Sequence, residues 1–278
     1  MSKIKSIKEA LNDAKEILKD ISDTPKKEAT ILAKYLLNVD DSYLFLHEED
    51  EFKPYNKFIS LVKRRGKAEP IEYITNRVSF YSREFFIDRG ALVPRPETEL
   101  LIDEVVKNIK KLNSKELCIA EIGIGSGIIS IVLALLLPKV RVVASDISKD
   151  ALNIAKINIK RYALEDRIKL YHTPYLKGID EDIDIILSNP PYVSNSFKID
   201  RPLEYEPREA IFGGKEGSEI LFDIINLAKD RGVKFLACEM GYDQKISMQN
   251  ALLDRGFKDF YFYKDLAGLD RGFVAKNS

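Results

Sequence analysis

The chain contains a short segment, Asn189-Pro190-Pro191-Tyr192, in which an amide side chain is followed by two rigid prolines and a phenol ring. The apolar run before it, residues 185–187, predicts a buried strand, which the prolines must end because proline cannot donate a hydrogen bond to a sheet ladder. The strand therefore presents Asn189 at the edge of a sheet. If a cofactor binds beside that edge, this segment is where we expect the chemistry.

A glycine-rich turn follows an earlier apolar run and reads Glu121-Ile-Gly123-Ile-Gly125-Ser-Gly127. Glycine at a strand-to-helix turn permits positive φ angles and close approach of the backbone to a ligand at the helix N-terminus. The spacing differs from the G-x-G-x-x-G signature of dinucleotide-binding proteins. A nucleotide-like ligand is the functional interpretation, and tight packing of strand on helix is the structural alternative.

A second acid, Asp146, ends the next apolar run. A carboxylate at the end of that strand can accept both hydroxyl protons of a ribose. Taken alone, Asp146 could be the acid at the start of the following helix. Together with Glu121 and the glycines, it predicts a nucleoside-containing cofactor.

Strand and helix signals alternate around these motifs. We predict strands at 117–122, 140–145, 168–171, 183–188, 233–239, 257–262 and 272–275, and helices at 96–111, 128–137, 149–162, 218–231 and 244–254. Such alternation predicts an α/β fold with a largely parallel sheet that helices cover on both faces.

The first quarter of the chain has helical periodicity instead. One apolar stripe is formed by Ile4, Ile7, Leu11, Ala14, Leu18 and Ile21. A second helix is predicted to begin with Thr24 as N-cap and Pro25 as its first residue, with Ile31, Leu32, Tyr35 and Leu36 on its inner face. With shorter helices at 43–46 and 55–65, these predict a small helical bundle over residues 1–75.

Aromatic residues then mark a predicted β-hairpin linker over residues 76–92, with Phe80-Tyr81 and Phe85-Phe86-Ile87 separated by three polar residues. The remaining domain covers residues 93–278. Its first segment, residues 93–99, contains Pro96, which suits the start of a helix.

Composition limits the function. Lysine plus arginine and aspartate plus glutamate both number 44, so a formal net charge of +0 argues against a nonspecific nucleic-acid binder. Cys118 and Cys238 lie far apart in apolar runs, which predicts reduced core thiols and no metal site. The charged start of the chain lacks the apolar segment of a signal peptide, and the apolar run at 128–137 is too short to span a bilayer. We expect a cytoplasmic protein without a membrane partner.

These motifs carry a family resemblance. The turn at 121–127, Asp146 and the segment at 189–192 resemble an S-adenosylmethionine-dependent methyltransferase that modifies a nitrogen on a planar group. Further segments make the chain similar to the HemK-type (PrmC) methyltransferases: the helical N-terminal region, Val-Pro-Arg-Pro-Glu-Thr-Glu at 93–99, Glu-Pro-Arg-Glu-Ala at 206–210, Gly213-Gly214, Glu-Met-Gly at 239–241, and the run at 265–271.

The resemblance implies a seven-stranded, Rossmann-like class I methyltransferase domain with a helical substrate-recognition domain. It also implies the reaction: transfer of the methyl group of S-adenosylmethionine to the side-chain nitrogen (N5) of the glutamine in the Gly-Gly-Gln motif of peptide chain release factors. S-adenosylhomocysteine is then the product. Neither a metal nor a stable nucleic-acid partner is expected.

The resemblance assigns residues to the cofactor. Glu121 is the acid of the turn, Gly123, Gly125 and Gly127 line the methionine part and the adenosine turn, Asp146 binds the ribose, Tyr175 flanks the adenine, and Asn189 contacts both cofactor and substrate. Two departures stand out: Glu121 replaces a usual aspartate, and Thr173-Pro174 replaces the usual acid before the aromatic residue. The segment at 93–99 is expected to close over the methyl-transfer pocket, its alternative being a simple helix start.

The same resemblance gives the acceptor site its roles. A glutamine amide nitrogen is a poor nucleophile because its lone pair is delocalised. The side-chain carbonyl of Asn189 and the backbone carbonyl of Pro190 can accept its two N–H bonds, and Tyr192 can stack on its plane. Pro191 keeps these acceptors fixed. No dedicated general base is expected, because His47 and His172 are predicted to be surface or packing residues.

Two other functions remain open. The Asn-Pro-Pro-Tyr segment would also suit an amino-methyltransferase acting on a nucleic-acid base, although neither net charge nor a large recognition insertion supports one. The departures at Glu121 and Pro174 would suit a non-catalytic cofactor-binding interaction protein.

Overall fold

The computed structural model describes residues 5–112 and 116–277. The chain forms two compact units. The first comprises the chain up to Arg77 together with Asp200–Tyr205, and the second comprises Val78–Ile199 and the chain from Glu206 onward. Each unit has its own buried core, so each is described by itself.

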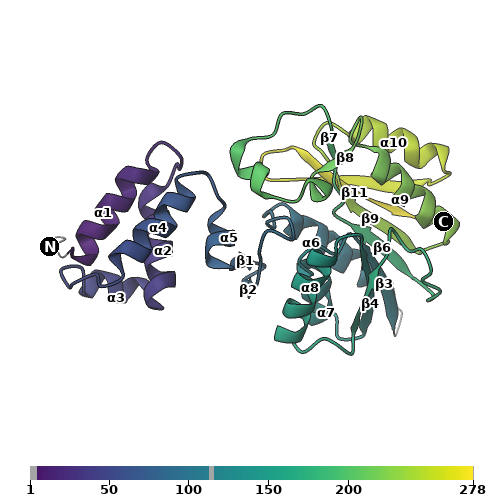
Figure 1. The fold of residues 1–278 in the computed structure, drawn as a ribbon. Coiled ribbons are helices and arrows are strands. Elements are labelled where there is room, and N and C mark those ends of the chain that lie inside the picture. The colour runs from purple at the N-terminus through teal and green to yellow at the C-terminus, as the bar shows by residue number, and fades with distance from the viewer. Residues whose placement is uncertain (1–4, 113–115, 278) are drawn as a thin grey trace. The chain divides into compact units, whose positions relative to one another are not determined.

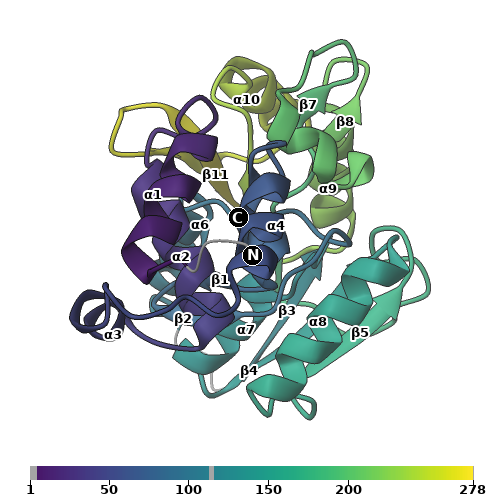
Figure 2. The same ribbon diagram turned by 60° about the vertical axis from the view of Figure 1, so that its left-hand side comes forward.

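The first unit is helical. Its elements are α1 (Ile7–Leu18), α2 (Pro25–Leu37), α3 (Asp41–Leu46), α4 (Tyr55–Arg65), α5 (Ile71–Thr75) and the 3₁₀ segment η1 (Arg201–Tyr205). A capping box starts α1, because Ser6 accepts from the backbone N–H of Glu9 while the Glu9 carboxylate accepts from the N–H of Ser6. Helices α1, α2 and α4 pack side by side (Figure 2).

The core of this unit corrects the predicted inner face of α2. The helix buries Ala29, Leu32 and Ala33, and Leu36 packs against the same cluster, whereas Ile31 is outside this cluster and Tyr35 is 37% exposed. The stripe that starts at Ala29 and Ala33 continues to Leu36 and Leu37 and leaves Tyr35 beside it, where the guanidinium of Arg77 covers the Tyr35 ring. The first helix follows its predicted stripe at Ile7, Ala14 and Leu18, while Ile4 lies outside the described residues.

The second unit is built on a seven-stranded sheet in the order β10-β11-β9-β6-β3-β4-β5. The strands are β3 (Leu117–Ile122), β4 (Val140–Asp146), β5 (Ile168–His172), β6 (Ile185–Ser188), β9 (Phe235–Glu239), β10 (Asp259–Lys264) and β11 (Asp270–Lys276). Neighbours from β9 to β5 pair in parallel, and β11 is antiparallel to both of its neighbours. The predicted α/β class and seven strands are confirmed.

Helices cover both faces of this sheet (Figure 1). They are α6 (Thr98–Ile109), α7 (Ile128–Leu136), α8 (Lys149–Arg161), α9 (Glu219–Asp230) and α10 (Lys245–Asp254). Strand β3 explains the two layers, since its side chains alternate: Ala120 packs in the cluster with residues of α9 and α10, whereas Glu121 bonds to Ser130 on α7.

Smaller elements surround the sheet. A hairpin of β1 (Val78–Phe80) and β2 (Arg83–Phe85) turns at Tyr81 and Ser82, which both have positive φ angles. Its turn is shorter than predicted, because Arg83 and Glu84 pair within the strand. A second pair, β7 (Val193–Ser194) with β8 (Phe212–Gly214), and the 3₁₀ segment η2 (Arg208–Ala210) were not predicted.

Candidate active site

A cavity of about 280 Å³ opens at the carboxyl ends of β3, β4, β5 and β6. This edge is where ligands bind in open α/β sheets. Predicted site residues in its lining are Gly123, Gly125, Asp146, Tyr175, Asn189, Pro190 and Pro191. Segments that are far apart in the sequence therefore meet at one end of the sheet, as their positions after strands predicted.

The glycine turn forms the floor of this cavity. Gly123 and Gly125 have φ angles of +73° and +55°, and no atom lies within 4 Å of the point where a side chain would start. The turn is held to the next strand, because the N–H groups of Gly123 and Ile124 both donate to the carbonyl of Ser145. A non-glycine side chain would be strained here and would project into the open space.

Two other residues of the motif lie behind the turn and do not line the cavity. Gly127 precedes α7, where a Cβ would lie 3.3 Å from Ala155 on α8. Glu121 is fully buried and accepts hydrogen bonds from the backbone and side chain of Ser130. Burial raises the pKa of Glu121 to about 8. Gly127 and Glu121 therefore help to hold the turn in shape and do not form part of the cavity surface.

Asp146 fixes the geometry at the end of β4. Its two carboxylate oxygens accept from the backbone N–H groups of Ser148 at 2.8 Å and Gly125 at 3.0 Å. Burial raises its pKa, and the bonds from these N–H groups act in the opposite direction. Beside it, Ser145 is one of the lining residues, and its hydroxyl is buried without a partner among the described residues. Such a hydroxyl is suited to bonding a ligand.

An aromatic residue closes the end of β5. Tyr175 lines the cavity together with Thr173 and Pro174 and has a φ angle of +50°. Its hydroxyl donates to Asp223 over 2.6 Å, and partial burial together with this bond raises the tyrosine pKa. The hydrogen bond fixes the ring as a flat apolar wall.

The Asn-Pro-Pro-Tyr segment leaves β6 at the opposite wall. Asn189, Pro190 and Pro191 line the cavity, while Tyr192 packs behind them against the core. The side-chain amide of Asn189 donates to the hydroxyl of Thr98 over 3.1 Å. The hydroxyl of Tyr192 donates to Glu239 over 3.2 Å.

Glu206 is a site-supporting residue to which sequence reasoning gave no role. Its buried carboxylate accepts from the backbone N–H of Val93 at 2.9 Å and from the guanidinium of Arg95 at 2.6 Å. It therefore joins the segment at 206–210 to the segment at 93–99. The residues just before Val93, positions 90–92, line the cavity, whereas positions 93–99 are absent from its lining.

Other candidate groups lie away from the cavity. The imidazole ring of His47 is exposed, stacks on Tyr43 and forms a hydrogen bond with Asp50. His172 is exposed and bonds to the carbonyl of Ile147. Within residues 5–112 and 116–277, no cluster of three histidine, cysteine or acidic side chains could hold a metal. In the same described part of the chain, no helix is long and apolar enough to cross a membrane.

Comparison with known families gives two matches. A family model described as the PrmC N-terminal domain matches residues 9–75. A second, described as the methyltransferase small domain, matches residues 96–202. The first falls on the helical bundle and the second covers the glycine turn, Asp146 and the Asn-Pro-Pro-Tyr segment.

Similar proteins extend over almost the whole chain. A release factor glutamine methyltransferase from Coxiella burnetii is 34% identical, with 98% of this chain and 99% of that protein covered. A bifunctional methyltransferase from Rickettsia conorii is 36% identical over 96% of this chain, which spans only 57% of that protein. Among solved structures, the hMettl16 catalytic domain in complex with an RNA hairpin shares the fold, with a TM-score of 0.58, 15% identity and coverage of 82% of this chain and 95% of that one.

Proposed function

Because the chain belongs to the release factor glutamine methyltransferase family, we propose that it methylates the side-chain amide nitrogen of the glutamine in the Gly-Gly-Gln motif of peptide chain release factors. The methyl donor is S-adenosylmethionine. The observation that carries the proposal is the single cavity that the glycine turn, Asp146 and Asn189 line together.

The cavity fits this cofactor. Gly123 and Gly125 leave space where side chains would otherwise begin, and the unpartnered hydroxyl of Ser145 offers a hydrogen bond to a polar ligand. Each carboxylate oxygen of Asp146 accepts one backbone N–H and retains a lone pair for a ribose hydroxyl. When bound, S-adenosylmethionine supplies an electrophilic methyl group on a positively charged sulfur.

The charge of the lining agrees with a cationic ligand. Its ionisable groups include two carboxylates, those of Asp146 and Glu209, and the described lining contains neither lysine nor arginine. Opposite charge at close range stabilises a sulfonium group. A phosphate backbone would meet the opposite environment, because nucleic-acid sites rely on lysine and arginine.

The acceptor amide is oriented by the segment that follows β6, the strand next to β3 and its glycine turn. The Nδ2 group of Asn189 donates to Thr98, so its Oδ1 atom can accept one N–H of the substrate glutamine. The backbone carbonyl of Pro190 accepts the other. Holding both hydrogens in the amide plane directs a face of the nitrogen toward the methyl group and stabilises the positive charge that develops on nitrogen.

The helical unit is proposed to bind the release factor, since a protein substrate needs more contact area than a small cavity offers. The domain roles given above and the roles of the site residues that line the cavity belong to the same proposal, whereas Tyr192, which packs behind the lining with its hydroxyl on Glu239, is not placed to stack on the substrate amide. The alternatives, a nucleic-acid base as acceptor and a non-catalytic module, become outcomes of one experiment.

The test is incubation of the protein with tritiated S-adenosylmethionine and four possible acceptors: a release factor, its Gly-Gly-Gln variant with glutamine changed to alanine, DNA and ribosomal RNA. We expect label in the release factor and none in its alanine variant. Label in nucleic acid but not in release factor would contradict the proposal. Calorimetric titration identifies the third case, because a chain that does not bind S-adenosylmethionine is no methyltransferase.

A further inference from the structure

A chain of buried hydrogen bonds runs from the cavity wall into the core of the second unit. Asn189 Nδ2 donates to Thr98 Oγ1 over 3.1 Å, and Thr98 Oγ1 donates to Glu239 Oε2 over 2.8 Å. The second oxygen of Glu239 accepts from the hydroxyl of Tyr192 over 3.2 Å. Thr98 and Glu239 are each only 2% exposed. The chain therefore joins the first residue of α6, the last residue of β9 and the segment after β6.

Each hydrogen bond in this series has a defined donor and acceptor when Glu239 is ionised. An ionised carboxylate is only an acceptor, so Thr98 must give its single hydroxyl hydrogen to Glu239. The oxygen of Thr98 is then an acceptor, and it must face the NH₂ group of Asn189 rather than the carbonyl oxygen. Because the NH₂ group of Asn189 faces Thr98, the carbonyl oxygen Oδ1 at the other end of the same amide points away from Thr98 and is left for the substrate.

We propose that ionised Glu239, acting through Thr98, holds Asn189 in the orientation that accepts the substrate amide, and that protonation of Glu239 allows this chain of hydrogen bonds to reverse. A neutral Glu239 donates its hydrogen to Thr98, and Thr98 then donates to Oδ1 of Asn189. The NH₂ group of Asn189 now faces the N–H groups of the glutamine, donor against donor. The inference rests on the proposed acceptor, a glutamine amide, and it makes Glu239 a positioning residue.

The groups around Glu239 bring its pKa close to neutral pH, so that both its ionised and its neutral form are populated there. Burial raises its pKa to about 7, against the hydrogen bonds from Thr98 and Tyr192. Glu97 ahead of α6 disfavours the ionised form and Arg271 on β11 favours it. From β10, the hydroxyl of Tyr263 also faces this region and bonds to the carbonyl of Cys238.

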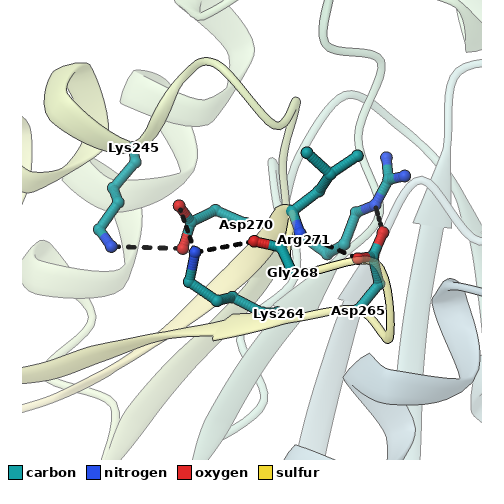
Figure 3. Close-up of polar contacts among 7 residues, drawn as sticks. Lys245, Lys264, Asp265, Gly268, Asp270 and Arg271 are labelled. Atoms are coloured by element: carbon teal, nitrogen blue, oxygen red, sulfur yellow. Dashed lines mark hydrogen bonds and ion pairs between the residues drawn. The ribbon is translucent and has the colours of Figure 1, made fainter.

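Arg271 is held in place by the loop between β10 and β11 (Figure 3). Its Nε donates to Asp265 over 2.7 Å, and the same carboxylate accepts from the backbone N–H of Leu269. At the base of the loop, Lys245 and Lys264 converge on Asp270. The positive charge that favours the ionised form of Glu239 is thus held in place by hydrogen bonds within this loop.

Glu239 does not act as a general base. Both of its oxygens are occupied by protein hydroxyl groups, and the carboxylate lies behind Asn189, outside the cavity lining. Its effect on the acceptor passes through Thr98. This separates it from a residue that would take the amide proton directly.

The experiment measures kcat, KM for release factor and the dissociation constant of S-adenosylmethionine for wild type, Glu239→Gln, Thr98→Val and Thr98→Ser across neutral pH. A glutamine at 239 can donate or accept, so it no longer sets the direction. We expect kcat to fall about ten- to a hundredfold in Glu239→Gln and Thr98→Val, with cofactor affinity retained. Thr98→Ser keeps the hydroxyl and should recover most of this loss.

The pH profile distinguishes positioning from a purely structural role. Wild-type kcat should fall about tenfold per pH unit below the pKa of Glu239, and this slope should disappear in Glu239→Gln. Glu104→Gln is the matched control. Glu104 on α6 also accepts from a tyrosine hydroxyl, that of Tyr261, but takes no part in the hydrogen bonds that link Glu239, Thr98 and Asn189. It should keep the wild-type profile. An unchanged slope in Glu239→Gln, or near-normal kcat in Thr98→Val, would overturn the inference.

A second readout needs no turnover. In protein labelled with ¹³C at glutamate carboxyls, the Glu239 signal, identified by its loss in Glu239→Gln, should titrate near neutral pH and shift to a higher pKa in Thr98→Val. A signal insensitive to Thr98→Val contradicts the hydrogen-bond chain even if release factor is methylated. Failure of wild type to methylate release factor contradicts the proposed function instead, so the two failures are distinguishable.

Discussion

The glycine pair after the 3₁₀ segment η2 offers a sharp test of how the acceptor loop is held. Gly213 on β8 lies directly against the backbone of the Asn-Pro-Pro-Tyr segment. A Cβ at this position would overlap the carbonyl oxygen of Pro191 and would lie 2.6 Å from the carbonyl oxygen of Gly217. The added methyl group is confined between two carbonyl oxygens, so Gly213→Ala must displace backbone.

The size of the displacement sets the expected effect. Real Cβ atoms essentially never approach other atoms closer than 3.0 Å, so the two carbonyls must separate by on the order of 1 Å. Overpacking of this kind costs about 1–3 kcal/mol of folding free energy. A shift of about 1 Å in the acceptor loop costs about a hundredfold in turnover. We expect both effects, because Pro191 lies within the loop that carries Asn189.

The assay is single-turnover methylation of release factor at saturating S-adenosylmethionine, with thermal unfolding measured in parallel. Gly66→Ala is the matched control, since its φ of −61° suits alanine and the nearest atoms to the new Cβ lie at 3.4 Å. That variant should keep wild-type turnover. If Gly213→Ala folds and turns over at the wild-type rate, the acceptor loop is not held by this contact.

Three further predictions concern the cavity and the core behind it. Asn189→Ala should lower kcat about a hundred- to a thousandfold with the fold intact, as circular dichroism and single-turnover assays would show; near-normal methylation would exclude its role. Asp146→Asn should weaken S-adenosylmethionine binding about ten- to a hundredfold, because hydrogen bonds to a charged acceptor are lost, and calorimetry that finds unchanged affinity would refute the ribose assignment. Glu121 carries a pKa of about 8 against an ordinary value of 4.5, so the folded state binds the proton more tightly than the unfolded state. Its contribution to stability is therefore full below pH 4.5 and is lost as pH rises through about 8, up to about 5 kcal/mol in all. Glu121→Gln should remove this slope in urea titrations without cofactor, and a difference from wild type that stays constant with pH would contradict the burial argument.

The sheet and the cavity wall could be predicted because their signals are local. Apolar runs ending at Glu121, Asp146 and Asn189 are strands whose carboxyl ends meet at one edge, whatever the details of packing. The prediction that Tyr35 faces the core of the helical unit was wrong. Periodicity alone could not choose between two adjacent faces of α2, and small residues, Ala29 and Ala33, occupy the face that packs.

The hydrogen bonds behind Asn189 could not be predicted in the same way. Thr98 is 91 residues from Asn189 and 141 residues from Glu239 in the sequence, so only the tertiary fold brings them together. A weak signal existed, because Thr98 and Glu239 both lie in segments that carried the family resemblance. The hydrogen bonds of Glu206 with Val93 and Arg95 likewise join residues that are far apart in the sequence. Such partners are chosen by packing rather than by local pattern.

Mass spectrometry of a release factor after incubation with the protein and S-adenosylmethionine shows directly whether the Gly-Gly-Gln glutamine is methylated. Fragmentation of the peptide that contains the Gly-Gly-Gln motif locates the modification to one residue. We predict one added methyl group on the side-chain amide of that glutamine, absent when the cofactor is omitted. An unmodified glutamine, in a preparation that binds S-adenosylmethionine, would contradict the proposed glutamine methylation.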